Sequence, residues 1–403
     1  MNQSDIAIIG GGISGLGLAH FCAKAGNNVR LFERNPKLGG ALQTQSVDDF
    51  WIELGAHTCY NSYETLIEIL HDLDLLKSIQ LRNRKPFRIC YNDQFCSIFS
   101  QLNKIELLRS IPHLLRTRKS GRTVRSYYER IAGRKNFERV LSNIFNAVAS
   151  QSTNEFPAEI LFKKRPRDKT IPRSFTLPNG LQSIASSIVS NRRIECKTSS
   201  KVTFLEHQTD GYSIETDDGE KHLSKKLAIA TPPAAAAHML NDICPELSSY
   251  LEEIRFVNVE SIGVVIESIN LKLEPIASAI ASDEVFFSIV SRDIIPHETL
   301  RGFTFHFAPG LLSHEEKISR IASLFDISQD KIKSVNDTSH ILPSFRVGHN
   351  EWLAQVDQLL DQTDLLLTGN YFYGMSIEDC LSRSKSQASR LLKSKKESVT
   401  YEK

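Results

Sequence analysis

The stretch IAIIGGGISGLGLAHFCAKAGNNVRLFE, residues 6–33, decides the fold of the first part of the chain. Residues 5–9 include an apolar run of the length of a buried strand, residues 13–25 suit a helix, and residues 29–32 suit a second strand. A strand, a helix and a second strand in this order are typical of a βαβ unit in a parallel sheet. We therefore expect an α/β domain at the amino terminus.

The glycine spacing within this unit points to a ligand. Gly10, Gly12 and Gly15 have the spacing G-x-G-x-x-G. In that pattern the first glycine allows a tight turn, the second lets a pyrophosphate approach the backbone, and the third lets the helix pack closely on the strand. Glu33 follows the second strand, where a carboxylate accepts hydrogen bonds from ribose hydroxyls. An acid at this place disfavours a 2′-phosphate, so the pattern predicts NAD or FAD.

Composition narrows the class of protein. The chain has 403 residues and a formal net charge of +2, and 41% of its residues are hydrophobic. This length predicts two or three domains, and the small net charge gives no indication of nucleic-acid binding. The seven cysteines are odd in number and form no C-x-x-C pair, so we expect neither a disulfide framework nor a metal site.

The same composition bears on localisation. No apolar run reaches the roughly 20 residues of a membrane-spanning helix, and the first strand leaves no room for a secretory signal. We expect a cytoplasmic protein, either free or attached peripherally to the inner face of a membrane. Residues 104–119 mix leucine and isoleucine with Arg109, Arg116 and Arg118 around Pro112. They suit either a basic interfacial helix or a kinked helix packed on a neighbouring domain.

Helical and strand patterns alternate along the rest of the chain. Asp210-Gly211 and Asp218-Gly219 are strong hairpin signals between alternating apolar and polar residues, and they predict a β-meander. Helical periodicity predicts helices at 64–81, 104–118 and 123–149. A second, largely antiparallel sheet is predicted from strands at 257–267, 285–290 and 302–307.

Several separated motifs resemble one protein family. In chain order they are ERNPKLGGALQT (33–44), FTLPNGLQSIASSIV (175–189), KVTFL (201–205), LAIATPPAAAAHML (227–240), LPSFRVGHNEW (342–352) and LLLTGNYFYGMSIEDCLSRS (365–384). Together they resemble the FAD-dependent protoporphyrinogen oxidases, within the superfamily that also contains the amine oxidases. The resemblance extends over nearly the whole chain and favours FAD over NAD.

This resemblance implies a fold and a set of boundaries. The fold is α/β, with a Rossmann-type FAD-binding domain built from discontinuous segments, a mixed α+β substrate domain and an inserted helical lobe. The implied segments are FAD-binding parts at 1–85, 191–240 and 346–395, a helical lobe facing substrate or membrane at 86–190, a substrate-domain sheet at 241–345, and a tail at 396–403.

The resemblance also implies residue roles. The glycines of the first turn would hold the pyrophosphate of a non-covalently bound FAD, Glu33 the ribose, and the backbone of Val202 the adenine. Because the flavin itself accepts the hydride, no acid–base side chain is required. The implied cofactor-binding residues are Gly10, Gly12, Ile13, Ser14, Gly15, Glu33, Arg34, Gly39, Gly40, Ala41, Val202, Gly369, Asn370, Met375 and Ser376. The candidate substrate-facing residues are His57, Phe305, Phe345 and Arg346.

Two of these candidates have a second interpretation. The family usually has Gly-Pro followed by an arginine or another polar residue where this chain has Ala56 and His57, so His57 either contacts substrate or is a structural histidine. Phe303, Phe305 and Phe307 alternate along one strand, so they either line a substrate cavity or fill the sheet core.

The implied activity is oxidation of a porphyrinogen in heme biosynthesis. Protoporphyrinogen IX would become protoporphyrin IX, or coproporphyrinogen III would become coproporphyrin III, with oxygen or a quinone reoxidising the flavin. Two alternatives stay open: an amine oxidase-like or desaturase-like enzyme acting on another apolar substrate, and a non-catalytic flavin-binding partner protein. The oligomeric state is open, a dimer included.

Overall fold

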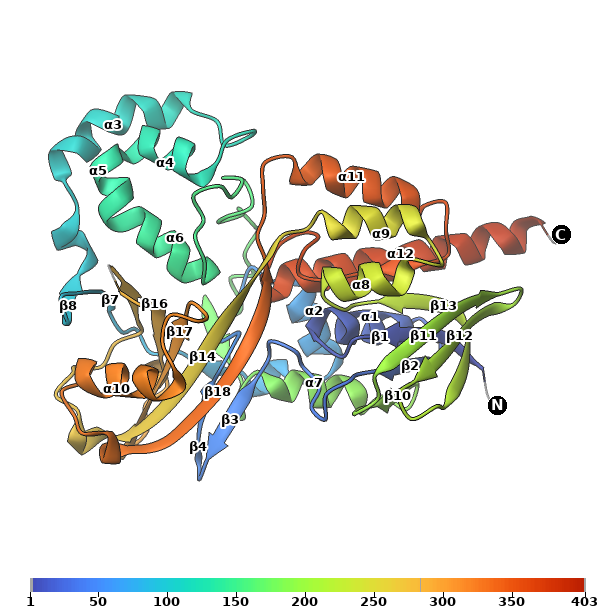
Figure 1. Cartoon of the computed structure of the whole chain (residues 1–403), viewed down its shortest axis with the longest axis horizontal. Coiled ribbons are helices and arrows are strands. Elements are labelled where there is room, and N and C mark those ends of the chain that lie inside the picture. The colour runs from blue at the N-terminus through green and yellow to red at the C-terminus, as the bar shows by residue number, and fades with distance from the viewer. Residues whose placement is uncertain (1–2, 283, 402–403) are drawn as a thin grey trace.

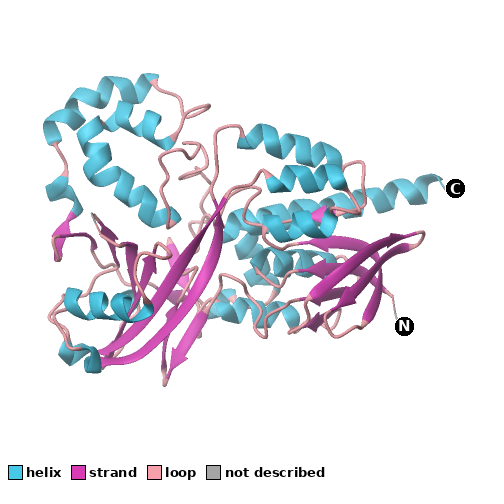
Figure 2. Ribbon diagram, in the orientation of Figure 1, coloured by secondary structure: helices cyan, strands magenta, loops and turns pink. Residues whose placement is uncertain are grey.

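The computed structural model describes residues 3–282 and 284–401, and it is built around two large sheets that lie side by side (Figures 1 and 2). The first sheet has the strand order β10-β2-β1-β13-β12-β11, with β19 paired to β13. Its strands are β1 (Ser4–Ile9), β2 (Val29–Phe32), β10 (Ile194–Lys197), β11 (Val202–Gln208), β12 (Gly211–Thr216), β13 (Lys221–Ile229) and β19 (Leu366–Leu367). β1 pairs in parallel with both β2 and β13, while β11, β12 and β13 form the expected antiparallel meander.

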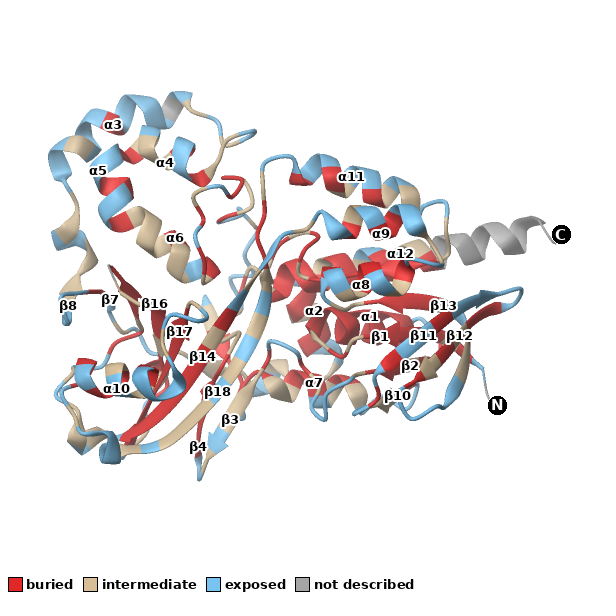
Figure 3. Ribbon diagram, viewed as in Figure 1, coloured by how far each residue is buried: buried red, intermediate tan, exposed pale blue. Residues whose placement is uncertain are grey.

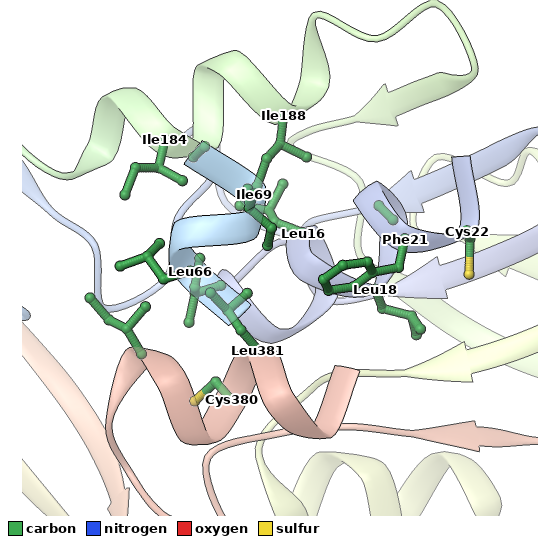
Figure 4. Packing of buried hydrophobic residues seen from close by; sticks show 14 of the residues in the cluster. Leu16, Leu18, Phe21, Cys22, Leu66, Ile69, Ile184, Ile188, Cys380 and Leu381 are labelled. Atoms are coloured by element: carbon green, nitrogen blue, oxygen red, sulfur yellow. The ribbon is translucent and has the colours of Figure 1, made fainter. Parts of the chain in front are cut away.

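Helices cover both faces of this sheet. Ile6 and Ile8 of β1 pack with the helices of one face, and Ala7 and Ile9 pack with those of the other. A strand buried on both sides has a continuous apolar run rather than an alternating pattern, which is why residues 5–9 were recognisable. The first face carries α1 (Ile13–Lys24), α2 (Glu64–Asp72), α7 (Gln182–Val189) and α12 (Ile377–Tyr401), shown in Figure 4; the second carries α8 (Pro233–Leu240), α9 (Pro245–Glu252) and α11 (His349–Leu360).

The second sheet has the order β18-β14-β17-β16-β15-β7-β8. It is mostly antiparallel, as predicted, but β15 and β7 pair in parallel. α10 (His314–Leu324) covers one face, and the hairpin of β3 (Thr44–Val47) and β4 (Phe50–Glu53) packs on the other. The strands are β7 (Phe87–Tyr91), β8 (Gln94–Ser97), β14 (Phe256–Glu267), β15 (Ser278–Ala281), β16 (Phe286–Ser291), β17 (Leu300–Phe307) and β18 (Ile332–Pro343).

A helical lobe with its own apolar core lies above the second sheet in Figure 1. It consists of η2 (Ile98–Gln101), α3 (Lys104–Arg116), α4 (Val124–Ala132), α5 (Arg134–Asn136), the π-helical turn η3 (Phe137–Leu141) and α6 (Ser142–Ala149). A small sheet and short turns complete the described elements: β5 (Cys59–Tyr60), β6 (Gln80–Leu81), β9 (Ser174–Thr176), η1 (Leu76–Ser78), η4 (Ser268–Asn270), η5 (Arg292–Ile294) and η6 (Gln329–Lys331).

Three elements differ from expectation. The helix predicted over 64–81 ends at Asp72, because Asp74 adopts a left-handed conformation with φ of 57° and reverses the chain. The helix predicted over 123–149 is interrupted at Gly133, whose φ is 90°. Within the segment 86–190 assigned to the lobe, β7 and β8 extend the second sheet and α7 packs on the first, because their apolar residues are buried there.

Candidate cofactor and substrate site

The glycine turn joins β1 to α1 and leaves one open position above it. A Cβ on Gly10 would lie 2.6 Å from the Ala230 carbonyl oxygen, and one on Gly15 would lie 1.9 Å from the Gly10 carbonyl oxygen. Folding alone therefore requires glycine at these two positions. A Cβ on Gly12, by contrast, would meet nothing closer than the Gly40 Cα at 3.8 Å. A ligand that approaches the backbone would give a reason for glycine at residue 12.

Glu33 and the Gly39-Gly40 loop border this opening. The Glu33 carboxylate accepts hydrogen bonds from the Gly11 N–H at 2.8 Å and the Asn35 N–H at 2.9 Å. The Gly39 N–H donates to the Gly11 carbonyl at 2.8 Å, so the loop is anchored on the glycine turn. The turn, the acid and the loop therefore lie together, as the sequence motif requires.

The segment before β11 brings the proposed adenine-binding residue to the same edge. The Glu33 N–H donates to the Lys197 carbonyl, and the Ser200 N–H donates to the Glu33 carbonyl, both at 2.9 Å. Val202 is buried two residues further on, at the start of β11. Residues about 165 positions apart in sequence are thus held against each other by backbone hydrogen bonds.

The carboxyl-terminal motif packs on the glycine helix. The Ser384 hydroxyl of α12 donates to the Ser14 carbonyl of α1 at 2.7 Å. Gly369 is buried just beyond β19, and half-buried Asn370 follows it. The Ser376 N–H donates to the Asp379 carboxylate at 3.3 Å, so this amide already has a partner within the chain.

Asp379 is also the centre of a charge cluster that sequence reasoning missed. Its carboxylate lies 2.6 Å from an Arg165 guanidinium nitrogen and 3.1 Å from Lys163 Nζ. The basic segment containing these two residues is thereby tied to the start of α12. Sequence offered only a run of cations here, and an exposed run of this kind normally stays solvated.

The remaining expected cofactor residues divide by exposure. Ile13 is 8% exposed and belongs to the α1 core, whereas Arg34 is exposed beyond Glu33. The Ala41 carbonyl accepts a hydrogen bond from the Ala56 N–H at 2.9 Å, which joins the Gly39-Gly40 loop to the chain leading to His57. Cys380 is buried, and burial raises the pKa of its thiol to about 12, so it is protonated at neutral pH.

Three histidines gather beside the Ala41 loop. His57 directly follows Ala56, whose N–H is hydrogen-bonded to Ala41, while His306 lies on β17 and His340 lies on β18. A Cβ on Gly55 would lie 2.2 Å from the Ala41 carbonyl oxygen and 3.1 Å from His340 Nε2, which places His340 against the same backbone. Burial, together with smaller contributions from nearby His57 and His340, lowers the pKa of His306 to about 3. Of these three histidines, only His57 was predicted from the sequence as a site residue.

A small pocket opens next to His57, between β4, β17 and η5. Glu53, Arg292 and Thr304 contribute to its wall. The Glu53 carboxylate accepts from the Leu181 N–H at 2.7 Å and the Thr44 hydroxyl at 2.8 Å, and burial raises its pKa to about 7. The Arg292 guanidinium carbon lies 4.0 Å from the Trp51 ring centroid.

Phe305 is not at this site, which corrects one candidate. Phe303, Phe305 and Phe307 are fully buried on the face of β17 that packs against α10, and Phe305 lies 5.7 Å from Phe325, ring centroid to ring centroid. The opposite face of β17 carries Thr304 and His306. Alternation identified the strand but not which face met the site, because all eight residues of β17 are buried.

The other two substrate candidates lie near the lobe. Phe345 is 3% exposed and packs edge to face on Phe156, with the half-buried Met375 in the same cluster. The Arg346 guanidinium donates to the Ser344 hydroxyl at 3.0 Å, so its side chain folds back on its own loop. Among the described residues no cluster of His, Cys, Asp or Glu is suited to a metal ion.

Comparison with known proteins supports the same architecture. Residues 8–73 match the NAD(P)-binding Rossmann-like domain family. Coproporphyrinogen III oxidase of Bacillus subtilis (strain 168) is 22% identical and aligns over 97% of this chain and 98% of its own length. A provisionally designated protoporphyrinogen oxidase from Exiguobacterium sp. 255-15 superposes with a TM-score of 0.77 at 17% identity, covering 96% of this chain and 98% of that one.

The amine oxidases share the fold as well. Putrescine oxidase bound to putrescine superposes with a TM-score of 0.71 at 12% identity, covering 97% of this chain and 99% of that one. The expected resemblance to the FAD-dependent amine oxidase and protoporphyrinogen oxidase superfamily is thereby confirmed, and the chain has the fold of that superfamily.

Proposed function

We propose that the chain is an FAD-dependent oxidoreductase that oxidises a porphyrinogen, with protoporphyrinogen IX and coproporphyrinogen III as the candidate substrates. The observation that carries the proposal is the end-to-end alignment with a coproporphyrinogen III oxidase, combined with an open glycine at residue 12. Amine oxidases and desaturases of the same fold supply the alternative substrates, and a flavin-binding partner protein without turnover is the alternative outside enzymes.

The residues present suit FAD. The Gly10–Gly15 turn would hold the pyrophosphate at the amino terminus of α1, Glu33 the ribose, and Val202 the adenine. Gly39, Gly40 and the chain around Gly369 would flank the flavin end, and the flavin would be bound non-covalently. When bound, FAD supplies the hydride acceptor, and this chain supplies orientation and a site closed to water.

Substitution of Gly12 tests cofactor binding. Gly12→Val should fold, because beyond the neighbouring residues of the turn the nearest atom to the new Cβ is the Gly40 Cα at 3.8 Å, yet the branched side chain would occupy the pyrophosphate position. The purified wild type should be yellow, with FAD released on heating, and the variant should lack FAD. A variant that retains FAD at full stoichiometry would contradict the assignment.

Initial-rate assays under controlled oxygen test the substrate. Each porphyrinogen should give its fluorescent porphyrin faster with the wild type than with flavin-free Gly12→Val, which measures oxidation by air. Oxygen and an added quinone are compared as acceptors. Equal rates in both proteins, for both substrates and acceptors, would leave only the alternative functions.

We also propose that α3 attaches the lobe peripherally to an anionic membrane surface. Ile105 and Leu108 are 64% and 65% exposed, and α3 lies on the outside of the lobe in Figure 3. Arg109 is exposed on the same helix, whereas its one acid, Glu106, accepts hydrogen bonds from backbone amides of the lobe. An exposed helix with apolar and basic side chains suits a lipid interface. None of the described helices is long and apolar enough to span a bilayer.

Sedimentation with vesicles tests this attachment. The wild type should sediment with phosphatidylglycerol vesicles more than with phosphatidylcholine vesicles, and less at high salt. The double variant Ile105→Glu/Leu108→Glu should stay in the supernatant. Ile269→Glu changes a still more exposed residue on η4 and should behave as the wild type. Unaltered sedimentation of the double variant would refute the proposal.

A further inference from the structure

Hydride transfer to FAD alone does not require the histidine cluster, yet backbone contacts fix which ring nitrogen is protonated in two of its members. The Nδ1 atom of His57 lies 3.1 Å from the Gly55 carbonyl oxygen, and the Nε2 atom of His340 lies 3.2 Å from the Leu54 carbonyl oxygen. A carbonyl oxygen only accepts hydrogen bonds, so each of these nitrogens must carry the proton. In a neutral imidazole the other nitrogen is then an unprotonated acceptor. The backbone contacts therefore leave Nε2 of His57 and Nδ1 of His340 unprotonated, and each of these atoms can accept a hydrogen bond or a proton.

The surroundings keep His57 neutral. The Arg82 guanidinium is near enough to act on it, and burial together with this charge lowers the pKa of His57 to about 4. Arg82 donates to the Thr58 hydroxyl at 2.6 Å, and its Nε has no hydrogen-bond partner among the described residues. Buried His306 and half-buried His340, whose pKa values are both lowered by loss of contact with water, complete the environment. At neutral pH, His57 therefore offers a lone pair rather than a positive charge.

The position of His57 relates this lone pair to the proposed reaction. The Ala56 N–H donates a hydrogen bond to the carbonyl of Ala41, which directly follows the Gly39-Gly40 loop that would flank the flavin. This bond holds His57, the next residue along the chain, beside that loop. His57 also lines the pocket that includes Thr304 from β17. The imidazole is thus placed where the flavin side of the first domain meets the second sheet.

We propose that His57 Nε2 accepts the proton that leaves a substrate N–H group when a hydride leaves the neighbouring carbon. This inference rests on the proposed function and adds to it a substrate class, namely compounds whose oxidised carbon is bonded to, or conjugated with, an N–H group. A pure hydrocarbon would leave the buried acceptor nitrogen without a partner, which costs free energy.

The step balances as follows. The C–H bond breaks and its hydrogen leaves with two electrons as hydride to FAD, the N–H bond breaks and its proton goes to His57 Nε2, and a new π bond extends the conjugation between carbon and nitrogen. Loss of hydride makes the N–H group strongly acidic, so even a weakly basic imidazole can receive the proton. The proton passes to solvent before the next turnover. A porphyrinogen requires three such turnovers and the shift of one hydrogen from the last saturated meso carbon to a nitrogen, because a porphyrin has lost four meso hydrogens and two N–H hydrogens.

Single-turnover flavin reduction tests the proposal. Wild-type holoprotein is mixed anaerobically with protoporphyrinogen IX or coproporphyrinogen III, and loss of the oxidised-flavin absorbance is followed. His57→Asn retains an amide N–H that can donate to the Gly55 carbonyl but removes the acceptor nitrogen. We expect about a 100-fold slower reduction, the lower end of the usual effect of a general base. His238→Asn changes an exposed histidine on α8 and should reduce at the wild-type rate.

Two further measurements distinguish a chemical role from a structural one. Affinity for the porphyrin product, followed through perturbation of the flavin spectrum, should change less than tenfold in His57→Asn. If that variant loses FAD, His57→Gln replaces it, because Gln fills a similar volume and is not basic. Equal reduction rates in wild type and variant would overturn the role of His57, while the proposed function would stand.

A comparison with a polyene hydrocarbon tests the requirement for an N–H group in the substrate. Wild-type flavin should not be reduced by a polyene hydrocarbon at a rate comparable with that of a porphyrinogen. Comparable rates would overturn the requirement for an N–H group. If no N–H substrate, porphyrinogen or amine, reduces the wild-type flavin, the proposed function fails together with this inference.

Discussion

Glu53 shows how one residue can couple the pocket to protein stability. Its carboxyl is 7% exposed and accepts hydrogen bonds from the Leu181 amide and the Thr44 hydroxyl, which connect β4 to the start of α7 and to β3. These bonds and the nearby Arg292 favour the charged form, but burial outweighs them and raises the pKa from 4.5 to about 7.

This raised pKa predicts a pH dependence. Between pH 4.5 and 7 the folded protein holds a proton on Glu53 that the unfolded chain has lost, so stability falls as pH rises through this window. The shift corresponds to about 3 kcal/mol at most. The thermal midpoint of the wild type should therefore decrease more from pH 5 to pH 8 than that of Glu53→Gln. Parallel decreases in both proteins would show that Glu53 does not titrate in this range.

At the residue scale, the sequence predicted the residues of a local motif. It did not predict which face of a strand meets the site or which residues distant in sequence come together there. Gly10, Gly12 and Glu33 were predictable because the turn and its acid are close in sequence. For Phe305 the sequence left open whether it lines a substrate cavity or fills the sheet core, since alternation does not say which buried face meets a site. His306 and His340 reach His57 because their strands, β17 and β18, both pair with β14. These strands lie some 250 residues or more after His57 in the chain, and the sequence contains no local signal for their approach.

Among the elements, α1 has the most enclosed position. Eleven of its residues, from Ile13 to Ala23, are buried, because the sheet lies on one side and α12 and α7 on the others (Figure 4). Gly17 is what permits the close contact with α12, since a Cβ there would lie 2.4 Å from the Leu381 Cδ2 atom. The helix therefore has no polar face, and its period gives little indication of how it packs.

A pair of substitutions tests this contact. Gly17→Ala should destabilise by overpacking, and Leu381→Ala should cost about 2–5 kcal/mol by leaving a cavity. The double variant should lose less than the sum, because the smaller side chain makes room for the new Cβ. Thermal midpoints measure all four proteins. Combining Gly17→Ala with Leu251→Ala, in the core of the opposite face, should be additive. An additive Gly17/Leu381 pair would contradict the packing argument.

Elements with a local signal were predicted and elements fixed by tertiary contacts were not. The strand at residues 29–32 and the hairpin at Asp210-Gly211 match the structure, because a buried apolar run and a two-residue turn are specified by adjacent residues. β7 and β8 were hidden in a segment read as helical. β7 becomes a strand because β15, about 190 residues later, supplies the hydrogen-bonding edge, and β8 in turn pairs with β7.

For the molecule as a whole, the expected cofactor site is made from segments that are distant in sequence. The turn at 10–15, the loop at 33–41 and the segment before β11 are joined by backbone hydrogen bonds, and the chain around 369–376 connects β19, which pairs with β13, to α12, which packs on α1. A ligand that contacts all four segments binds only the folded protein, so it stabilises that state by mass action.

FAD should therefore raise the thermal midpoint of the flavin-stripped protein in a concentration-dependent way. At 100 times the dissociation constant the stabilisation is about 2.7 kcal/mol. Gly12→Val should show no such shift, and AMP, which contacts only the Glu33 and Val202 end, should give a smaller one. The measurement is thermal unfolding across a series of FAD concentrations. An equal shift in the Gly12→Val protein would mean that FAD binds elsewhere.

The packing of α12 on α1 also has a consequence for biosynthesis. The helix that covers α1 begins at Ile377, far along the chain from α1, so a nascent chain emerging from the ribosome carries the bare apolar surface of α1 until α12 has been synthesised. β19, which adds to β13, emerges almost as late. The first domain can close only after α12 has emerged, and a message truncated shortly before codon 377 would yield a product with α1 still uncovered, which chaperones and proteases would be expected to recognise.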